Sequence, residues 1–251
     1  MRLDTYLQQK GFFDSRTKAK QAIERGEIFV NGTKILKSAY EIEENAEYLI
    51  NHVATESYVS LGGYKLKKAL SDFNFNVQNL VCADLGSSTG GFTDCLLKNG
   101  AKFVYAVDLN DTLLHETLKS NINVKYVIKN VKDISKKDFD NEIDLVTVDL
   151  SFISSTIIFE RLKNIIPSGK HIILLIKPQF ESDKKISFKN GIIKDDKIRF
   201  SAAEKVISRA IEFGFYPHNF TVAPISQEKN VEYLVLLCKD TQVSFNLKEY
   251  F

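Results

Sequence analysis

The chain has 251 residues, of which 44% are hydrophobic and 26% are charged, and its formal net charge is +2. This composition provides enough apolar side chains for a sizeable core and excludes a disordered chain. The length fits one large domain or a small domain joined to a larger one. Because the net charge is close to zero, only local clusters of charge can indicate a nucleic-acid partner.

Three widely spaced cysteines, Cys82, Cys95 and Cys238, form no CxxC pair, which disfavours a cysteine metal site. Each lies in an apolar stretch and is predicted to be a buried free thiol, as suits a reducing compartment. The N-terminal segment lacks the apolar core of a signal peptide. No apolar run approaches the roughly 18 residues of a membrane helix. We therefore expect a cytoplasmic protein without a membrane partner.

The first 50 residues are predicted to form a small α+β unit. Ser15 is a helix-cap candidate, Gly26 ends the helix, and Asn31-Gly32 predicts a tight hairpin. Residues 10–37 hold seven basic and three acidic side chains, a local net charge of +4. A basic helix and hairpin of this kind can be an ordinary solvated surface or a surface for RNA phosphates.

The stretch "SRTKAKQAIERGEIFVNG" resembles the S4 RNA-binding domain, which we place at residues 1–58. The resemblance implies that structured RNA is bound through its phosphates and shape more than through its bases. The predicted RNA-binding residues are Arg2, Arg16, Lys18, Lys20 and Arg25.

Residues 59–79 are predicted to be a linker followed by a helix that leads into the second domain. Gly62-Gly63 marks a turn, and Leu66, Ala69 and Leu70 share one face of the helix after it. Lys65 lies in the first turn, where a single lysine is ordinarily a surface residue.

From residue 80 onward, β-rich runs begin near residues 80, 102, 124, 143 and 170, with helical patterns between most of them. This alternation predicts a Rossmann-like α/β fold, with a mostly parallel sheet and helices on both faces, over residues 80–251. A helix over residues 200–213 is followed by two strands and a short turn, which predicts a terminal antiparallel hairpin. Residues 178–198 are polar and lysine-rich and are predicted to be an irregular lid.

The stretch "ADLGSSTGGFTDCLL", starting at Ala83, runs from a strand through a glycine loop into a helix. Small residues allow a ligand to approach the backbone, and Asp108 ends the next strand, where an acid commonly accepts bonds from ribose hydroxyls. A dinucleotide or S-adenosylmethionine fits such a loop, and a tight packing turn is the alternative without a ligand. The GxGxxG and Walker patterns are not met, whereas "DLG" resembles the first motif of class I methyltransferases. The predicted cofactor-binding residues are Asp84, Gly86, Ser87, Ser88, Thr89, Gly90, Gly91, Phe92, Asp108, Leu109, Asn130 and Asp149.

Three ionisable residues are predicted to meet at one edge of the sheet. Asp149 and Lys177 each follow a strand, and Glu232 begins a strand that runs the other way. Ligands of open α/β sheets bind at the carboxyl ends of the strands. Each residue alone has an ordinary structural explanation, but their convergence favours a catalytic site.

In combination, "YVSLGGYKL", "DLGSSTGGFTDCLL", "VDLSFISS", "IKPQFE" and "NVEYL" resemble the TlyA-type ribosomal RNA 2′-O-methyltransferases. These enzymes join an S4 domain to an FtsJ-like catalytic domain. The resemblance implies methyl transfer from S-adenosylmethionine to the ribose of a cytidine, and the short N-terminus favours the large ribosomal subunit. It also implies a catalytic tetrad, which maps to Lys65, Asp149, Lys177 and Glu232.

Chemically, a ribose 2′-hydroxyl must lose its proton as it attacks the methyl group. We expect Lys177 to be the general base, with Lys65 raising the local positive potential and the two acids orienting the lysines. No metal is needed. The alternatives are a haemolysin, a non-catalytic RNA-binding protein that keeps the fold, and a base or small-molecule methyltransferase. The oligomeric state is open, with a monomer favoured.

Overall fold

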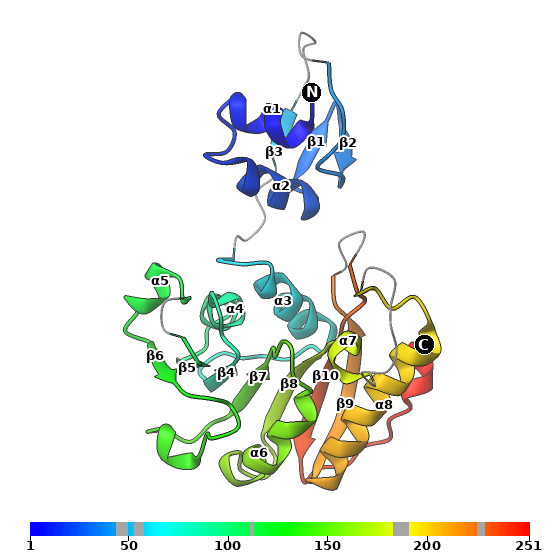
Figure 1. Ribbon diagram of the computed structural model, residues 1–251. Helices are drawn as coiled ribbons and strands as arrows, with labels where there is room; N and C mark the ends of the chain where they lie inside the picture. Colours follow the sequence, from blue (N-terminus) through cyan, green and yellow to red (C-terminus); the bar gives the residue numbers. More distant parts are fainter. Residues whose placement is uncertain (44–49, 53–57, 111–112, 183–190, 225–228) are drawn as a thin grey trace. The chain divides into compact units, whose positions relative to one another are not determined.

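The computed structural model describes residues 1–43, 50–52, 58–110, 113–182, 191–224 and 229–251. It contains two compact units, Met1–Ser57 and Tyr58–Phe251 (Figure 1). Each unit has a hydrophobic core of its own, so each is described separately below.

The first unit packs two helices on a small antiparallel sheet. The helices are α1 (Leu3–Gln9) and α2 (Arg16–Glu24), and the strands are β1 (Ile28–Val30), β2 (Thr33–Ile35) and β3 (Ile50–His52), in the order β2-β1-β3. Ser15 caps α2 by accepting the amide of Lys18 at 3.2 Å. Asn31 and Gly32 have φ of 50° and 78°, the conformation of a type I′ hairpin. The predicted helix cap and hairpin are confirmed.

The second unit contains a seven-stranded sheet. Its strands are β4 (Val81–Leu85), β5 (Phe103–Asp108), β6 (Val124–Ile128), β7 (Leu145–Val148), β8 (His171–Ile176), β9 (Phe215–Val222) and β10 (Tyr233–Lys239). The order is β6-β5-β4-β7-β8-β10-β9. The first five strands are parallel, and β10 is antiparallel to both of its neighbours. The predicted fold class and terminal hairpin are therefore confirmed.

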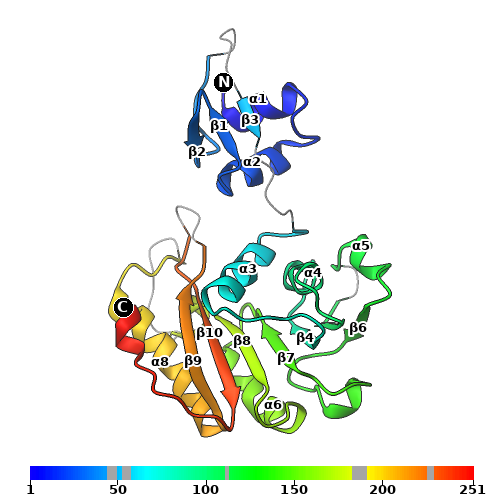
Figure 2. The same cartoon turned by 180° about the vertical axis from the view of Figure 1, so that it is seen from behind.

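Helices cover both faces of this sheet, as Figures 1 and 2 show. On one face, α3 (Gly62–Asp72) and α4 (Gly91–Lys98) share a core that includes Ile173. On the other, α6 (Phe159–Ile165) and α8 (Asp196–Glu212) share a core that includes Ile172. Neighbouring residues of β8 thus point to opposite buried faces, as a strand covered by helices on both sides of the sheet requires. The remaining helical turns are α5 (Glu116–Lys119), α7 (Pro178–Glu181) and the 3₁₀ turns Lys136–Asp138, Ser155–Ile158 and Leu247–Tyr250.

The predicted irregular lid at residues 178–198 was wrong at both of its ends. Pro178 starts the short helix α7, which suits its fixed φ and missing amide proton. Helix α8 begins at Asp196, because the side chain of Asp195 accepts the amide of Lys197 at 2.8 Å and caps it. Residues 183–190 of that prediction lie outside the described residues. Helix α3, expected within residues 59–79, packs into the core of the second unit.

Candidate active site

Two lysines and two acids meet at the edge where the central strands of the second unit end. Asp149 follows β7, Lys177 follows β8, and Lys65 lies near the start of α3. Glu232 precedes β10, whose first residue pairs with the last residue of β8. Because β10 runs antiparallel, its beginning lies at the carboxyl end of β8, as the sequence predicted. Four distant segments of the chain therefore build one site.

The four residues form two ion pairs. Lys177 Nζ lies 2.5 Å from Asp149 Oδ1 and donates a hydrogen bond to Ser151 Oγ at 2.7 Å. Lys65 Nζ lies 2.6 Å from Glu232 Oε2. Lys177 is only 8% exposed, so without these partners its ammonium would lose hydration with no compensation. A lysine can therefore end this core strand because an acid and a hydroxyl lie within hydrogen-bond distance of its ammonium.

The side chain of Gln179 joins the second ion pair. Its Nε2 lies 3.5 Å from Glu232 Oε1, and its buried Oε1 has no hydrogen-bond partner among the described residues. Sequence reasoning did not single out Gln179, although it lies within the quoted "IKPQFE". Two positions separate it from Lys177, which places both side chains at the same strand end.

A buried glutamate ties together the two loops that carry Asp149 and Lys177. Glu181 is 2% exposed, and its Oε1 accepts Ser155 N and Ser155 Oγ, both at 2.7 Å. Its Oε2 accepts the hydroxyl of Ser154. Sequence reasoning missed this glutamate because helix α7 is too short to show a buried face by periodicity. Ser154 and Ser155, the last two residues of "VDLSFISS", were the available signal.

The loop that carries Asp149 also holds an exposed aromatic residue with unusual backbone geometry. Phe152 has φ of 67° and is 87% exposed. A positive φ is strained for a bulky side chain and is common at functional sites. Its ring centroid lies 5.2 Å from that of Phe180, and Lys177 Nζ lies 5.9 Å from the Phe180 centroid. Sequence patterns carry no signal for this conformation.

The glycine loop lies directly beside Asp149. Gly86 has φ of 81°, and a Cβ atom at this position would stand 2.5 Å from the backbone oxygen of Asp149. The carbonyl of Val107 accepts the amides of Gly86 and Ser87 at 2.9 and 3.1 Å. Only glycine therefore fits at the first loop position, and the loop and the ion pairs belong to one site.

Asp84 lies in β4, just before the glycine loop, and supports it from the protein interior. It is fully buried, and its carboxylate accepts the hydroxyls of Thr93 at 2.7 Å and Thr147 at 3.0 Å. Burial raises the pKa of the Asp84 carboxyl to about 7, although the two hydroxyls act in the opposite direction. Phe92, 3% exposed, is likewise part of the core. Asp84 and Phe92 are therefore buried residues that support the loop from the core.

The other predicted cofactor residues lie in the loop or at and after the ends of β5 and β6. Asp108 accepts the amides of Ser88 at 2.8 Å and Leu109 at 2.7 Å. Ser88, Thr89 and Leu109 are exposed, and Gly90 and Gly91 are buried where α4 begins. The side chain of Asn130 accepts the amide of Lys132 at 3.0 Å.

The loop fits a cofactor that carries a carboxylate and a ribose. Ser87 Oγ is buried and has no hydrogen-bond partner among the residues that the structure describes. Buried hydroxyls are rarely left unsatisfied, so this one is available to a ligand. The start of α4 favours a negative group, while Asp108 keeps acceptor capacity for hydroxyls. S-adenosylmethionine has these features.

Two other kinds of site are absent from the described part of the chain. The described residues hold no group of three or more His, Cys, Asp or Glu side chains that could bind a metal ion. Nor does any helix of this part have the length and apolar character to cross a bilayer. Cys82, Cys95 and Cys238 are free and buried, as predicted.

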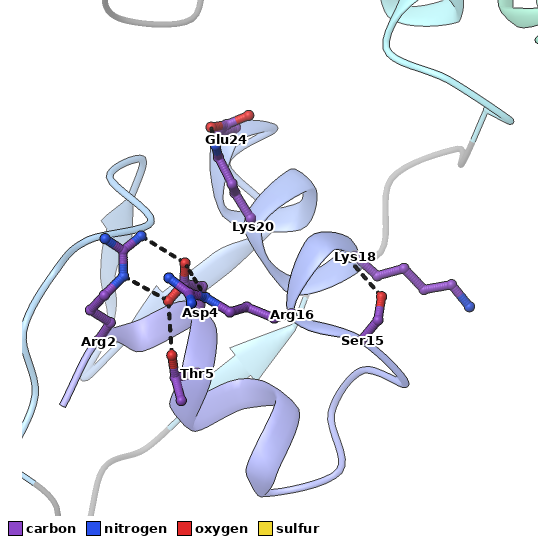
Figure 3. A network of polar contacts seen from close by, with 8 residues as sticks. All are labelled: Arg2, Asp4, Thr5, Ser15, Arg16, Lys18, Lys20 and Glu24. Carbon is purple, nitrogen blue, oxygen red and sulfur yellow. Dashed lines mark hydrogen bonds and ion pairs between the residues drawn. The ribbon is translucent and has the colours of Figure 1, made fainter.

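The five predicted RNA-binding cations of the first unit all have acidic partners. Their ion pairs are Arg2–Asp4 at 2.8 Å, Arg16–Asp4 at 3.2 Å, Lys18–Asp14 at 2.7 Å, Lys20–Glu24 at 3.7 Å and Arg25–Glu27 at 2.6 Å. Arg25 is 16% exposed, whereas the other four range from 43% to 61%. Figure 3 shows two of them, Arg2 and Arg16, meeting at one carboxylate.

Comparisons with known proteins give matches to both units. Residues 58–239 match the FtsJ-like methyltransferase family, and residues 1–47 match the S4 domain. Hemolysin A of Brachyspira hyodysenteriae is 44% identical and covers 93% of this chain and 98% of its own length. The 23S rRNA (cytidine-2′-O)-methyltransferase TlyA of Campylobacter jejuni is 32% identical and covers 96% and 100%.

Among solved structures, a Streptococcus thermophilus protein that bears the name hemolysin is 33% identical to this chain. It superimposes with a TM-score of 0.74 and covers 99% of this chain and 93% of its own. With a family match over most of the second unit and an S4 match over the first, the chain belongs to the FtsJ-like methyltransferases of the TlyA type.

Proposed function

We propose that this protein transfers a methyl group from S-adenosylmethionine to the ribose 2′-hydroxyl of a cytidine in ribosomal RNA, with the large subunit as substrate. One observation carries the proposal: the ion pairs of Lys177 with Asp149 and of Lys65 with Glu232 lie beside the glycine loop. The relative in Campylobacter jejuni bears the name of this reaction on 23S rRNA. A ribosomal substrate also implies a cytoplasmic enzyme.

When bound, S-adenosylmethionine supplies a methyl group on a sulfonium centre, whose carbon–sulfur bond breaks as the carbon–oxygen bond forms. The buried hydroxyl of Ser87 and the start of α4 would hold its carboxylate, and Asp108 would hold its ribose hydroxyls. Gly86 keeps the loop close to Asp149, so a cofactor held by the loop would lie beside the ion pairs. Such positioning supplies much of the rate in a direct displacement.

The chain's own residues remove one proton, that of the ribose 2′-hydroxyl. Once its ammonium has passed one proton to solvent, Lys177 accepts the proton of the 2′-hydroxyl as that oxygen attacks, and becomes an ammonium again. Asp149 and Ser151 fix the position of its Nζ. Glu232 holds Lys65, whose positive charge stabilises the negative charge that develops on the attacking oxygen.

The experiment compares the protein with its Lys177→Met variant, using methyl-labelled S-adenosylmethionine and purified ribosomal subunits. Label on a cytidine ribose of the large subunit, located by mass spectrometry, is the expected result. Loss of a general base costs about a hundredfold or more in rate. Cofactor binding without label on either subunit or on naked RNA would favour a non-catalytic RNA-binding protein or a haemolysin.

Lys170→Met is the matched control. Lys170 lies at the opposite end of β8, and its Nζ also pairs with an aspartate, Asp144, at 2.5 Å. It does not touch the site, so we expect this variant to keep most of its activity. Equal losses in the two variants would show that removing an ion pair from this sheet is enough to stop the reaction, and would contradict the role of Lys177.

A further inference from the structure

A prominent feature of the first unit is a buried carboxylate that carries two arginines. The side chain of Asp4 is 1% exposed, whereas those of Arg2 and Arg16 are 43% and 54% exposed. Figure 3 shows the two guanidinium groups reaching the same carboxylate. An acid in the middle of a predicted RNA-binding surface is unexpected, because its charge opposes the approach of phosphates.

The contacts at Asp4 fix the orientation of both arginines. Arg2 binds in a forked manner, with Nε donating to Oδ1 at 3.1 Å and Nη2 to Oδ2 at 2.8 Å. Arg16 Nε lies 3.2 Å from Oδ2. The hydroxyl of Thr5 donates to Oδ1 at 3.3 Å. A guanidinium has five N–H donors, so each arginine keeps donors beyond those that Asp4 engages.

The backbone holds Asp4 itself in place. It lies in the first turn of α1, where the helix dipole favours a carboxylate. Its amide donates to the carbonyl of Ser38 at 3.3 Å, and the amide of Leu3 donates to the carbonyl of Tyr40 at 2.8 Å. Arg16 is the first residue of α2. The carboxylate thus joins the starts of both helices and holds two cations together that would otherwise repel one another.

We infer that Asp4 is a positioning residue for RNA binding, which presents Arg2 and Arg16 as a paired, pre-oriented site for backbone phosphate. This inference rests on the proposed function, because it takes RNA as the partner of the S4 domain. Two exposed guanidinium groups on one buried acid keep a net positive charge and further donors. That combination suits phosphate oxygens, which guanidinium groups bind in a forked manner.

The direction of the effect of Asp4→Asn separates positioning from simple charge. The substitution removes a negative charge from a surface that binds polyanions, so electrostatics alone predicts tighter binding. If Asp4 positions the arginines, binding weakens instead, by about three- to tenfold. The slope of log affinity against log salt also becomes shallower, by about 1 for each phosphate that the protein no longer binds.

The experiment measures binding of the full-length protein to large-subunit ribosomal RNA over a range of salt concentrations. Asp14→Asn is the matched control, because Asp14 is 87% exposed and pairs with a single predicted RNA-binding cation, Lys18. It makes the same change of charge, and we expect unchanged or slightly tighter binding. Binding by Asp4→Asn that is equal to or tighter than that of the wild type would overturn the inference, as would equal weakening in both variants.

A second variant decides the question if Asp4→Asn unfolds the first unit, which hydrogen exchange of α1 would reveal. Arg2→Lys keeps the charge and leaves Asp4 intact but removes the fork. A loss of affinity supports the inference, and unchanged affinity overturns it. Failure of the wild-type protein to bind the RNA at all would instead overturn the proposed function.

Discussion

Asp4 and Asp84 are buried carboxylates, one in each unit, yet their surroundings give them opposite character. Burial raises the pKa of both, but hydrogen bonds from Arg2 and Arg16 outweigh it at Asp4 and lower its pKa below the ordinary value. At Asp84 burial prevails over the hydroxyls of two threonines, and the pKa rises to about 7. Partners with full charge can compensate desolvation, whereas neutral hydroxyls cannot. The two carboxylates also differ in depth, because Asp84 lies deep in the larger unit and Asp4 nearer the surface of the smaller one. Depth and partners together make Asp4 an anchor for cations and Asp84 a proton-holding support.

The largest expected effect concerns the pH dependence of the second unit. Because the pKa of Asp84 is about 7 in the folded state and near 4 when unfolded, the folded state binds more protons between these values. Its contribution to stability is complete below about pH 4 and declines as pH rises towards 7, by at most about 4 kcal/mol. Asp84→Asn removes this decline.

Unfolding of the wild type and Asp84→Asn at pH 5 and pH 8, without cofactor, tests this difference. Hydrogen exchange of β4 reports on the second unit alone. We expect the free energy of unfolding of Asp84→Asn, relative to that of the wild type, to be higher at pH 8 than at pH 5. A constant difference between the two proteins at both pH values would show that Asp84 does not hold a proton in this range.

A smaller effect is expected at Glu181, which resembles Asp84 in accepting hydroxyls but lies next to the ion pairs. Glu181→Gln leaves one oxygen for Ser155 and turns the other group into a donor facing Ser154. The loops beside Lys177 then shift, and we expect kcat to fall by about ten- to a hundredfold, because small displacements of positioned groups are costly. Substrate binding should change less.

Steady-state kinetics of Glu181→Gln, with cofactor affinity measured separately, checks this expectation. Glu160→Gln is the control, since Glu160 is exposed on α6. A variant with normal kcat would contradict the role of Glu181 in positioning. A loss confined to thermal stability would assign it to the core alone.

The smallest effect is expected in the first unit at acid pH. Since the pKa of Asp4 is lowered on folding, its contribution to stability is present above the unfolded value near 4 and is lost as pH falls through the folded value. The arginines are about half exposed, so solvent screening keeps the contribution small. The hydrogen-exchange protection factors of α1 amides should fall more in the wild type than in Asp4→Asn between pH 5 and pH 3, and an equal fall would contradict the pairing.

The sequence could predict which residues lie at the same edge of the sheet, because the ends of the strands determine that. Asp149, Lys177 and Glu232 were predicted to meet because the carboxyl ends of parallel strands share one edge. Their division into pairs could not be predicted, since Lys65 and Glu232 are 167 positions apart and no local pattern records which acid each lysine meets. The position of β10 between β8 and β9 could not be predicted for the same reason.

Local sequence patterns also could not predict the role of a residue where that role depends on a distant contact. The charge count over residues 10–37 indicated a basic surface, but not that Arg2 and Arg16 share Asp4. Nor does any residue propensity indicate the positive φ of Phe152 or the hydrogen bonds that Glu181 accepts from Ser155. These features arise from tertiary packing, which overrides local preference at functional sites.

The position of β10 between β8 and β9 has a consequence for the order of folding. The pair between Lys65 and Glu232 closes a loop of 167 positions, and β10 must insert before it can form. Contacts of such high sequence separation form slowly, whereas every strand pair of the first unit lies within 57 residues. During synthesis, the RNA-binding unit should mature while the catalytic unit is still incomplete. Pulse-labelled hydrogen exchange during refolding would show α1 protected before β10, and simultaneous protection would contradict that order.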